Sequence, residues 1–191
     1  GCSVTINDDN KYVPPGGRKV PITLNAEGVD KVIIDENSDF SEGRWEMFIP
    51  RKVYEVSEGD GPKRIFVKFR DKALNETEVF SGEVILDTKP PEAINLSINQ
   101  GEMYTNESSK TIQLDIEARD ASEMRIIQKG HQPGNWEPFR ASKQYTLLGE
   151  DGEKEIGVFL RDEAGNVTEP LVGRVVLDRR PPKPVSLVVD D

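Results

Sequence analysis

The chain has 191 residues, of which 35% are hydrophobic, and a formal net charge of −10. No apolar run approaches the roughly 20 residues that a transmembrane helix needs. The acidic balance argues against a nucleic-acid partner, because phosphate contacts require clustered Lys and Arg. The single cysteine excludes a disulfide within the chain. Together these features predict a soluble protein with one large or two ordinary domains, whose surplus carboxylates suit solubility or the binding of hard cations such as calcium.

Cys2 directly follows Gly1 at the start of the sequence. The pair resembles the end of a bacterial lipobox, in which a cysteine after a small residue becomes the acylated first residue of a lipoprotein. The resemblance implies lipidation of Cys2 and an extracellular or cell-surface location. The alternative is that Gly1 is left over from a cleaved tag.

Apolar residues alternate with polar ones over residues 20–26, and again over 65–69 and 84–86. A period of two is typical of a half-buried strand. Turns rich in Gly and Asp separate these segments, as at Glu58–Gly61. No stretch carries an apolar stripe of helical period, so the sequence predicts about seven short antiparallel strands in this half of the chain.

The same pattern returns in the second half, mostly at an offset of 91 residues. The matched pairs include Trp45 with Trp136, Asp71 with Asp162, Asn75 with Asn166, and Pro90 with Pro181. Nearer the start the offset is 92, so the second copy lacks one residue between the positions of Ile34 and Trp45. A period of this length suits an independent sandwich domain. The predicted fold is therefore all-β, with two tandem immunoglobulin-like (fibronectin-III-like) antiparallel β-sandwiches over residues 1–91 and 92–182.

The two copies join at a short segment that ends in Pro90 and Pro91. Two prolines fix φ and remove two backbone donors, which predicts a stiff junction rather than a flexible tether. Residues 183–191 repeat the pattern that follows the first proline pair. They are expected to form the first strand of a third copy in a longer protein, or to pack back as a spare edge strand.

The second copy carries Arg161-Asp162-Glu163-Ala164-Gly165-Asn166, then Leu177-Asp178 and Pro181-Pro182, with Trp136-Glu137-Pro138-Phe139 upstream. This spacing resembles a recurrent bacterial Ig-like repeat of exported and cell-surface proteins. The resemblance covers both copies and implies stalks, adhesin segments or appendages of extracellular enzymes. The first copy departs from it at Leu74, where the second has Gly165. If that turn needs a left-handed residue, Leu74 costs roughly 1 kcal/mol.

The resemblance also implies a calcium site, because some related repeats bind calcium through the aspartate of this turn and the aspartate before the linker. By residue match the ligands are Asp71, Asn75 and Asp87 in the first copy, and Asp162, Asn166 and Asp178 in the second. Calcium takes six to eight hard oxygens, which carboxylates and turn carbonyls supply. The alternative is that the same side chains cap backbone amides in an Asx-type turn.

Trp45 and Trp136 recur in register, each three residues before a phenylalanine. Exposed rings would form a platform for stacking on sugars. The alternative, which the repetition favours, is that both rings plug the sandwich core or seal its end.

Catalysis finds little support in the sequence. His131 is the only histidine, lies in a Gly- and Pro-rich loop, and has no counterpart in the first copy. No phosphate-binding loop or zinc spacing is present. We therefore expect a non-catalytic structural or adhesive module, acting as a stiff spacer or protein-interaction stalk. The alternative is a carbohydrate-binding or accessory module of an extracellular enzyme. The expected partners are further domains of a longer chain and an extracellular protein or glycan.

Overall fold

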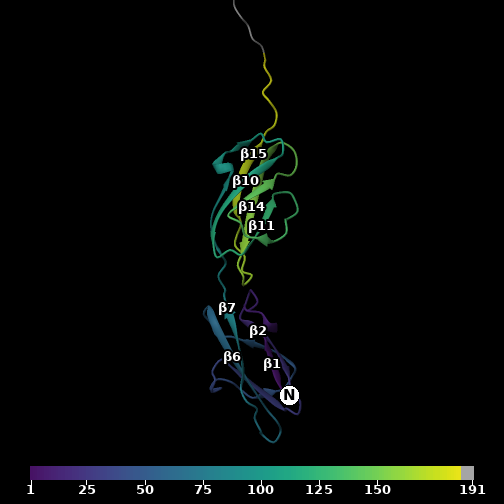
Figure 1. The fold of residues 1–191 in the computed structure, drawn as a ribbon, viewed down its shortest axis with the longest axis vertical. Coiled ribbons are helices and arrows are strands. Elements are labelled where there is room, and N and C mark those ends of the chain that lie inside the picture. Colours follow the sequence, from purple (N-terminus) through teal and green to yellow (C-terminus); the bar gives the residue numbers. More distant parts are fainter. Residues whose placement is uncertain (186–191) are drawn as a thin grey trace, which may run out of the picture. The chain divides into compact units, whose positions relative to one another are not determined.

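The structure is a computed structural model that describes residues 1–185. The chain folds into two compact units that meet in the sequence between Lys89 and Pro90. Apart from two single turns at Asn7–Asp9 and Asn99–Gly101, the regular elements of the described residues are all strands (Figure 1). No helix of this part of the chain is long and apolar enough to cross a membrane. The predicted third strand over residues 183–191 falls mostly on residues 186–191, which lie outside the described residues.

The first unit is a sandwich of a three-stranded and a four-stranded antiparallel sheet. The three-stranded sheet has the order β1 (Ser3–Ile6), β2 (Lys19–Asn25), β5 (Arg51–Glu55). The four-stranded sheet has the order β4 (Glu46–Met47), β3 (Lys31–Asp35), β6 (Gly61–Arg70), β7 (Phe80–Leu86).

The second unit repeats this arrangement and adds one short strand. Its first sheet has the order β13 (Ser142–Thr146), β10 (Thr111–Arg119), β8 (Glu92–Ile98). Its second sheet has the order β12 (Glu137–Pro138), β11 (Glu123–Gln128), β14 (Gly152–Arg161), β15 (Leu171–Leu177), β9 (Tyr104–Thr105). The β9 strand pairs parallel to β15, and an isolated parallel bridge from Tyr12 to Ile85 marks the same place in the first unit.

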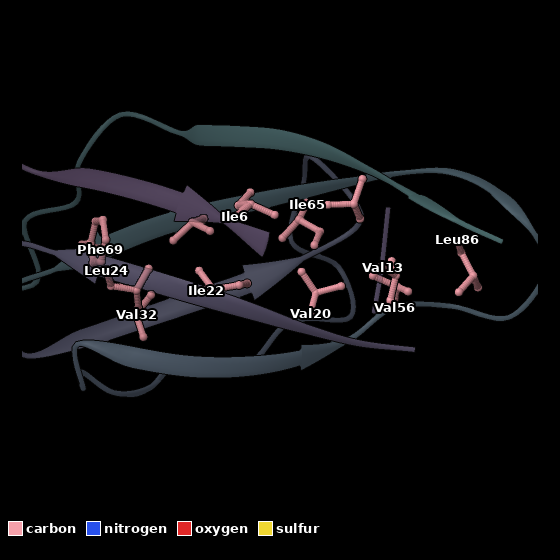
Figure 2. Close-up of a cluster of buried hydrophobic side chains, with 12 residues drawn as sticks. Ile6, Val13, Val20, Ile22, Leu24, Val32, Val56, Ile65, Phe69 and Leu86 are labelled. Atoms are coloured by element: carbon pink, nitrogen blue, oxygen red, sulfur yellow. The ribbon is translucent and has the colours of Figure 1, made fainter. Parts of the chain in front are cut away.

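The core of each unit consists of the apolar rows that the alternation predicts. Figure 2 shows Val20, Ile22, Leu24, Ile65 and Phe69 of the first unit in one buried cluster. The matching cluster of the second unit includes Ile112, Leu114, Ile116, Ile156, Val158 and Leu160. The predicted fold class and the strand faces are confirmed, because period two on a half-buried sheet leaves little freedom in which face points inward.

On one side of each sandwich, an isoleucine of the first strand packs over a glycine of the last strand and closes the gap between the two sheets. A Cβ on Gly82 would lie 2.8 Å from the Cδ1 atom of Ile6, and a Cβ on Gly173 would lie 2.8 Å from Cδ1 of Ile98. Each isoleucine on the first strand therefore packs directly over backbone. The opposite side of the first sandwich, between β5 and the β3–β4 pair, has no such seal and holds a groove of about 560 Å³.

Candidate functional site

The turn after β6 holds two of the predicted calcium ligands, Asp71 and Asn75. Asp71 Oδ1 accepts a hydrogen bond from the Asn75 backbone N–H at 2.9 Å, and Oδ2 accepts one from Asn75 Nδ2 at 2.9 Å. The backbone closes the same turn, since Asp71 N donates to Asn75 O at 3.1 Å. These bonds, first from the Asn75 side chain and then from its backbone N–H, lower the pKa of the Asp71 carboxyl. The geometry is that of a capped turn in which Asn75 contacts both carboxylate oxygens.

A threonine two residues after each turn asparagine binds the turn back to its strand. Thr77 Oγ1 accepts from Phe69 N at 3.2 Å, and Thr77 N donates to Phe69 O at 3.0 Å. Thr168 makes the same two bonds with Leu160, at 3.1 and 2.9 Å. The threonine of the repeated motif thus has a structural role in both units.

Leu74 has the left-handed backbone conformation that its counterpart suggested. Its φ is +67°, against +93° at Gly165, and the residue is 66% exposed. Replacing Leu74 with glycine is therefore expected to stabilise the first unit by about 0.5–1 kcal/mol, the strain relieved less the extra freedom of glycine in the unfolded chain. Thermal unfolding checks this, with Ala73→Gly as the control because Ala73 has no positive φ. A fall in stability on Leu74→Gly would show that the leucine is not strained.

The other predicted ligands lie where the chain leaves each unit. Asp87 Oδ1 accepts a hydrogen bond from Lys89 N at 3.1 Å, and Asp178 Oδ1 accepts one from Arg180 N at 3.1 Å. Both aspartates cap the segment that follows the last strand of their unit. The same residue type in the same place makes the same bond twice, so this cap belongs to the repeat.

A second aspartate holds each exit segment, and it is not among the site residues predicted from the sequence. Asp60 Oδ1 accepts from Thr88 N at 3.0 Å and from Thr88 Oγ1 at 2.8 Å. In the second unit Asp151 Oδ1 accepts from Arg179 Nε at 2.6 Å, which lowers the pKa of the Asp151 carboxyl. The sequence signal that could have identified these two aspartates is an acidic residue in the Gly-rich turn before β6 and before β14, present in both copies.

Within each unit the structure does not bring the predicted calcium ligands together. Asp71 and Asn75 lie before β7 and Asp87 follows it, and a strand of seven residues spans roughly 20 Å. Asp162 is buried after β14, whereas Asp178 follows β15 at its other end. Over residues 1–185 no three His, Cys, Asp or Glu side chains form a cluster that could hold a metal ion.

The calcium site accordingly stays a prediction. Its test is the melting temperature of the chain in millimolar calcium and in EDTA, because binding to the native state alone raises stability. An unchanged melting temperature would reduce these aspartates to turn and exit caps.

The two tryptophans lie outside both buried clusters and so do not plug the core, and the other half of the alternative, that they seal its end, stays a prediction. Each is half-buried beneath the arginine of the repeated Arg-Asp pair. The Arg70 guanidinium carbon lies 4.3 Å from the ring centre of Trp45. The guanidinium carbon of Arg161 lies 4.5 Å from the ring centre of Trp136, and that of Arg125 lies 4.7 Å from the same ring centre. Cation–π packing of this kind covers an aromatic surface with guanidinium groups, and sugar stacking by these rings remains a prediction.

Cys2 lies immediately before β1 and is partly buried against the core of the first unit. Its lipidation stays a prediction, which mass spectrometry of the protein isolated from its natural host would check.

Comparison with known proteins shows the fold and goes no further. No protein-family model matches the chain, and neither does any curated protein sequence. Among solved structures, the chain is similar to fibronectin(III)-like modules of CbhA from Clostridium thermocellum, at 15% identity and a TM-score of 0.61 over 92% of this chain and 94% of that one. It is also similar to the FN1–FN3 domains of chicken CNTN1, at 14% identity and a TM-score of 0.54 over 86% of this chain and 65% of that one. Domains from titin align at 10% identity and a TM-score of 0.54, over 92% of this chain and 65% of that one. The chain is thus a tandem pair of fibronectin-III-like β-sandwiches.

Proposed function

We propose that this chain is a non-catalytic spacer of an exported bacterial surface protein, in which tandem sandwiches hold other domains at a set distance. The observation that carries the proposal is the exit clamp, by which we mean Asp60 with Asp87 in the first unit and Asp151 with Asp178 in the second. Each clamp binds the second and third residues after the last strand of its own unit. A module whose exit segment is fastened to its own body transmits orientation to whatever follows.

The junction sequence supports the same function. Pro90 and Pro91 follow the clamped segment of the first unit at once, and neither can adopt the broad φ range of a flexible linker. The clamped Lys89 directly precedes the first proline. Clamped residues followed directly by prolines leave few rotatable bonds in which a hinge could form.

The test is a distance distribution between spin labels at matched positions of the two units. Ser81→Cys on β7 and Val172→Cys on β15 occupy equivalent exposed sites, and Cys2→Ser removes the native thiol. We expect one narrow distribution in pulsed electron–electron resonance. Replacing Pro90 and Pro91 with glycine is expected to broaden it, and Asp60→Ala to broaden it less, because each releases backbone freedom near the junction.

Asp151→Ala is the matched control, since it opens the clamp at the exit of the second unit and leaves the junction untouched. Its distribution is expected to equal that of the parent. A broad distribution in the parent chain, or no change on the double glycine substitution, would contradict a spacer function.

A further inference from the structure

Strand β5 (Arg51–Glu55) is an edge strand, last in the sheet order β1-β2-β5. The bonds that flank its ladder show which way its backbone points. Leu24 N donates to Pro50 O at 2.8 Å, and Val56 N donates to Arg18 O at 3.0 Å. Even-numbered residues therefore direct N–H and C=O toward β2. By the alternation of an antiparallel ladder, Arg51, Val53 and Glu55 direct theirs away from the sheet.

The space beside this edge is open. The groove of about 560 Å³ on this side of the sandwich is lined by β5 together with Val32 and Ile34 of β3 and Ile49 before β5. Val53 is 65% exposed and Ile49 is 50% exposed. An edge strand with outward backbone groups and exposed apolar side chains is a template for another strand.

The side chains along β5 are ordered so that the strand complements itself. Consider a second copy of β5 that runs antiparallel with Val53 opposite Val53. Arg51 of each copy then lies opposite Glu55 of the other, and the outward N–H and C=O groups of all three residues meet their equivalents as hydrogen-bonded pairs. Lys52 lies opposite Tyr54 in the same register.

Charged residues on an edge usually serve to prevent pairing, and here they select one register. Sliding the strands until Arg51 faces Arg51, or Glu55 faces Glu55, places like charges opposite each other. The present neighbours of these side chains hold them weakly. Arg51 pairs with Asp8 at 3.2 Å and Glu55 with Arg18 at 2.6 Å, both on the surface, where such pairs contribute little.

The second unit provides an internal comparison, because β13 (Ser142–Thr146) has the same place and edge. Its outward residues are Ser142, Gln144 and Thr146, which carry neither the opposite charges nor the apolar centre. The flanking Ile49 position is Arg140 in this unit. The self-complementary pattern therefore does not come from the fold and belongs to the first unit alone.

We propose that the first unit binds a second copy of this chain through antiparallel pairing of β5 with β5, centred on Val53. A single strand pair covers less area than a standard stable interface, so the dimer is expected to be weak, with a dissociation constant of about 10 μM to about 1 mM. Because the paired β5 strands run in opposite directions, the first units of the two chains lie antiparallel to each other in the dimer.

The first test is sedimentation over a range of concentrations with a charge swap. Arg51→Glu places carboxylates opposite each other at both ends of the pairing, and we expect association to weaken at least tenfold, roughly. Combining Arg51→Glu with Glu55→Arg restores opposite charges across the interface and is expected to restore dimerisation. Ser142→Glu, which places a carboxylate at the matched position of β13, is expected to leave dimerisation unchanged.

The second test fixes the register. With Cys2→Ser as background, Val53→Cys places two thiols at a hydrogen-bonded pair whose Cα atoms lie about 5.5 Å apart, within the range that a disulfide spans. Mild oxidation is expected to yield a covalent dimer, whereas Gln144→Cys in the second unit is expected to remain monomeric.

The proposal is overturned if the parent chain stays monomeric up to about 1 mM, or if Arg51→Glu dimerises as the parent does. It is also overturned if Gln144→Cys cross-links as readily as Val53→Cys. Circular dichroism melts show whether each charge variant is folded, and the cross-linking test keeps Arg51 and Glu55 unchanged, so it decides the matter should Arg51→Glu unfold.

Discussion

Replacing Phe69 with alanine is expected to lower the free energy of unfolding of the first unit by about 3–5 kcal/mol. Phe69 is fully buried toward one end of the cluster in Figure 2. Its ring meets those of Phe48 and Phe80 edge-on, with centroids 6.1 and 5.8 Å away. Alanine would remove both edge-to-face contacts and leave a cavity, because neighbouring strands held in a ladder relax only partly.

Calorimetry checks this expectation, because the second unit unfolds around its own core and is an internal reference. Phe69→Leu is the matched control. Leucine occupies the equivalent place, Leu160, and packs there with no exposure, so this variant is expected to retain most of the stability. A loss under about 1 kcal/mol on Phe69→Ala would mean that the three rings do not hold this end of the sandwich together.

The cores of both units followed from the sequence because one physical rule decides them. A half-buried strand must send alternate side chains inward, so Val20, Ile22 and Leu24 could be placed from their spacing alone. The repeat then gave the same pattern a second time in the matched strand of the second unit, at Ile112 and Leu114. The backbone conformation of Leu74 could be predicted in the same way. Glycine at its matched position indicated a left-handed turn, which the structure confirms.

The left-handed turns after the first strands did not follow from the sequence. Asn7, Asp8 and Asp9 all have positive φ, as do Asn99 and Gln100 of the second unit. Asn7 is held by tertiary contacts, since its buried Nδ2 donates to Asn10 O at 2.8 Å and to Tyr12 O at 2.6 Å. Local propensity allows asparagine in this conformation but cannot require it.

The candidate site was harder to predict than the core because its parts act through partners distant in the chain. Asp60 and Thr88 are 28 residues apart, and Trp45, just before β4, meets Arg70 of β6 because both strands pair with β3. A residue-by-residue match identified Asp71 and Asp87 correctly as repeated aspartates. That match took no account of the strand expected at residues 84–86, which separates the two aspartates within the unit.

A buried carboxylate fastens the loop after β3 to its strand. Asp35, at the end of β3, is 2% exposed and accepts hydrogen bonds from the backbone N–H groups of Asn37, Glu42 and Gly43 at 3.0, 2.9 and 2.6 Å. These bonds fold residues 36–43 back onto the strand. The matching position in the second unit is Ile127, which faces Gly157 as Asp35 faces Phe66. Asp35→Ala would leave three donors without this acceptor and is expected to lower the stability of the first unit by about 2–4 kcal/mol.

The same carboxylate makes the first unit sensitive to acid. Burial raises the pKa of Asp35, but the N–H groups of Asn37, Glu42 and Gly43 outweigh it and hold that pKa below its ordinary 3.8. A group whose pKa is lowered by folding contributes fully above its unfolded pKa, and the contribution is lost as the pH falls through the folded pKa. The stability difference between the parent and Asp35→Asn is therefore expected to be constant from neutral pH to about pH 5 and to shrink below about pH 4. Urea unfolding across this range measures it, with Asp39→Asn as the control because Asp39 lies in the same loop, exposed, and accepts one bond from Ser41 N. A difference that stays constant down to about pH 2 would show that Asp35 does not bind these amides as a carboxylate.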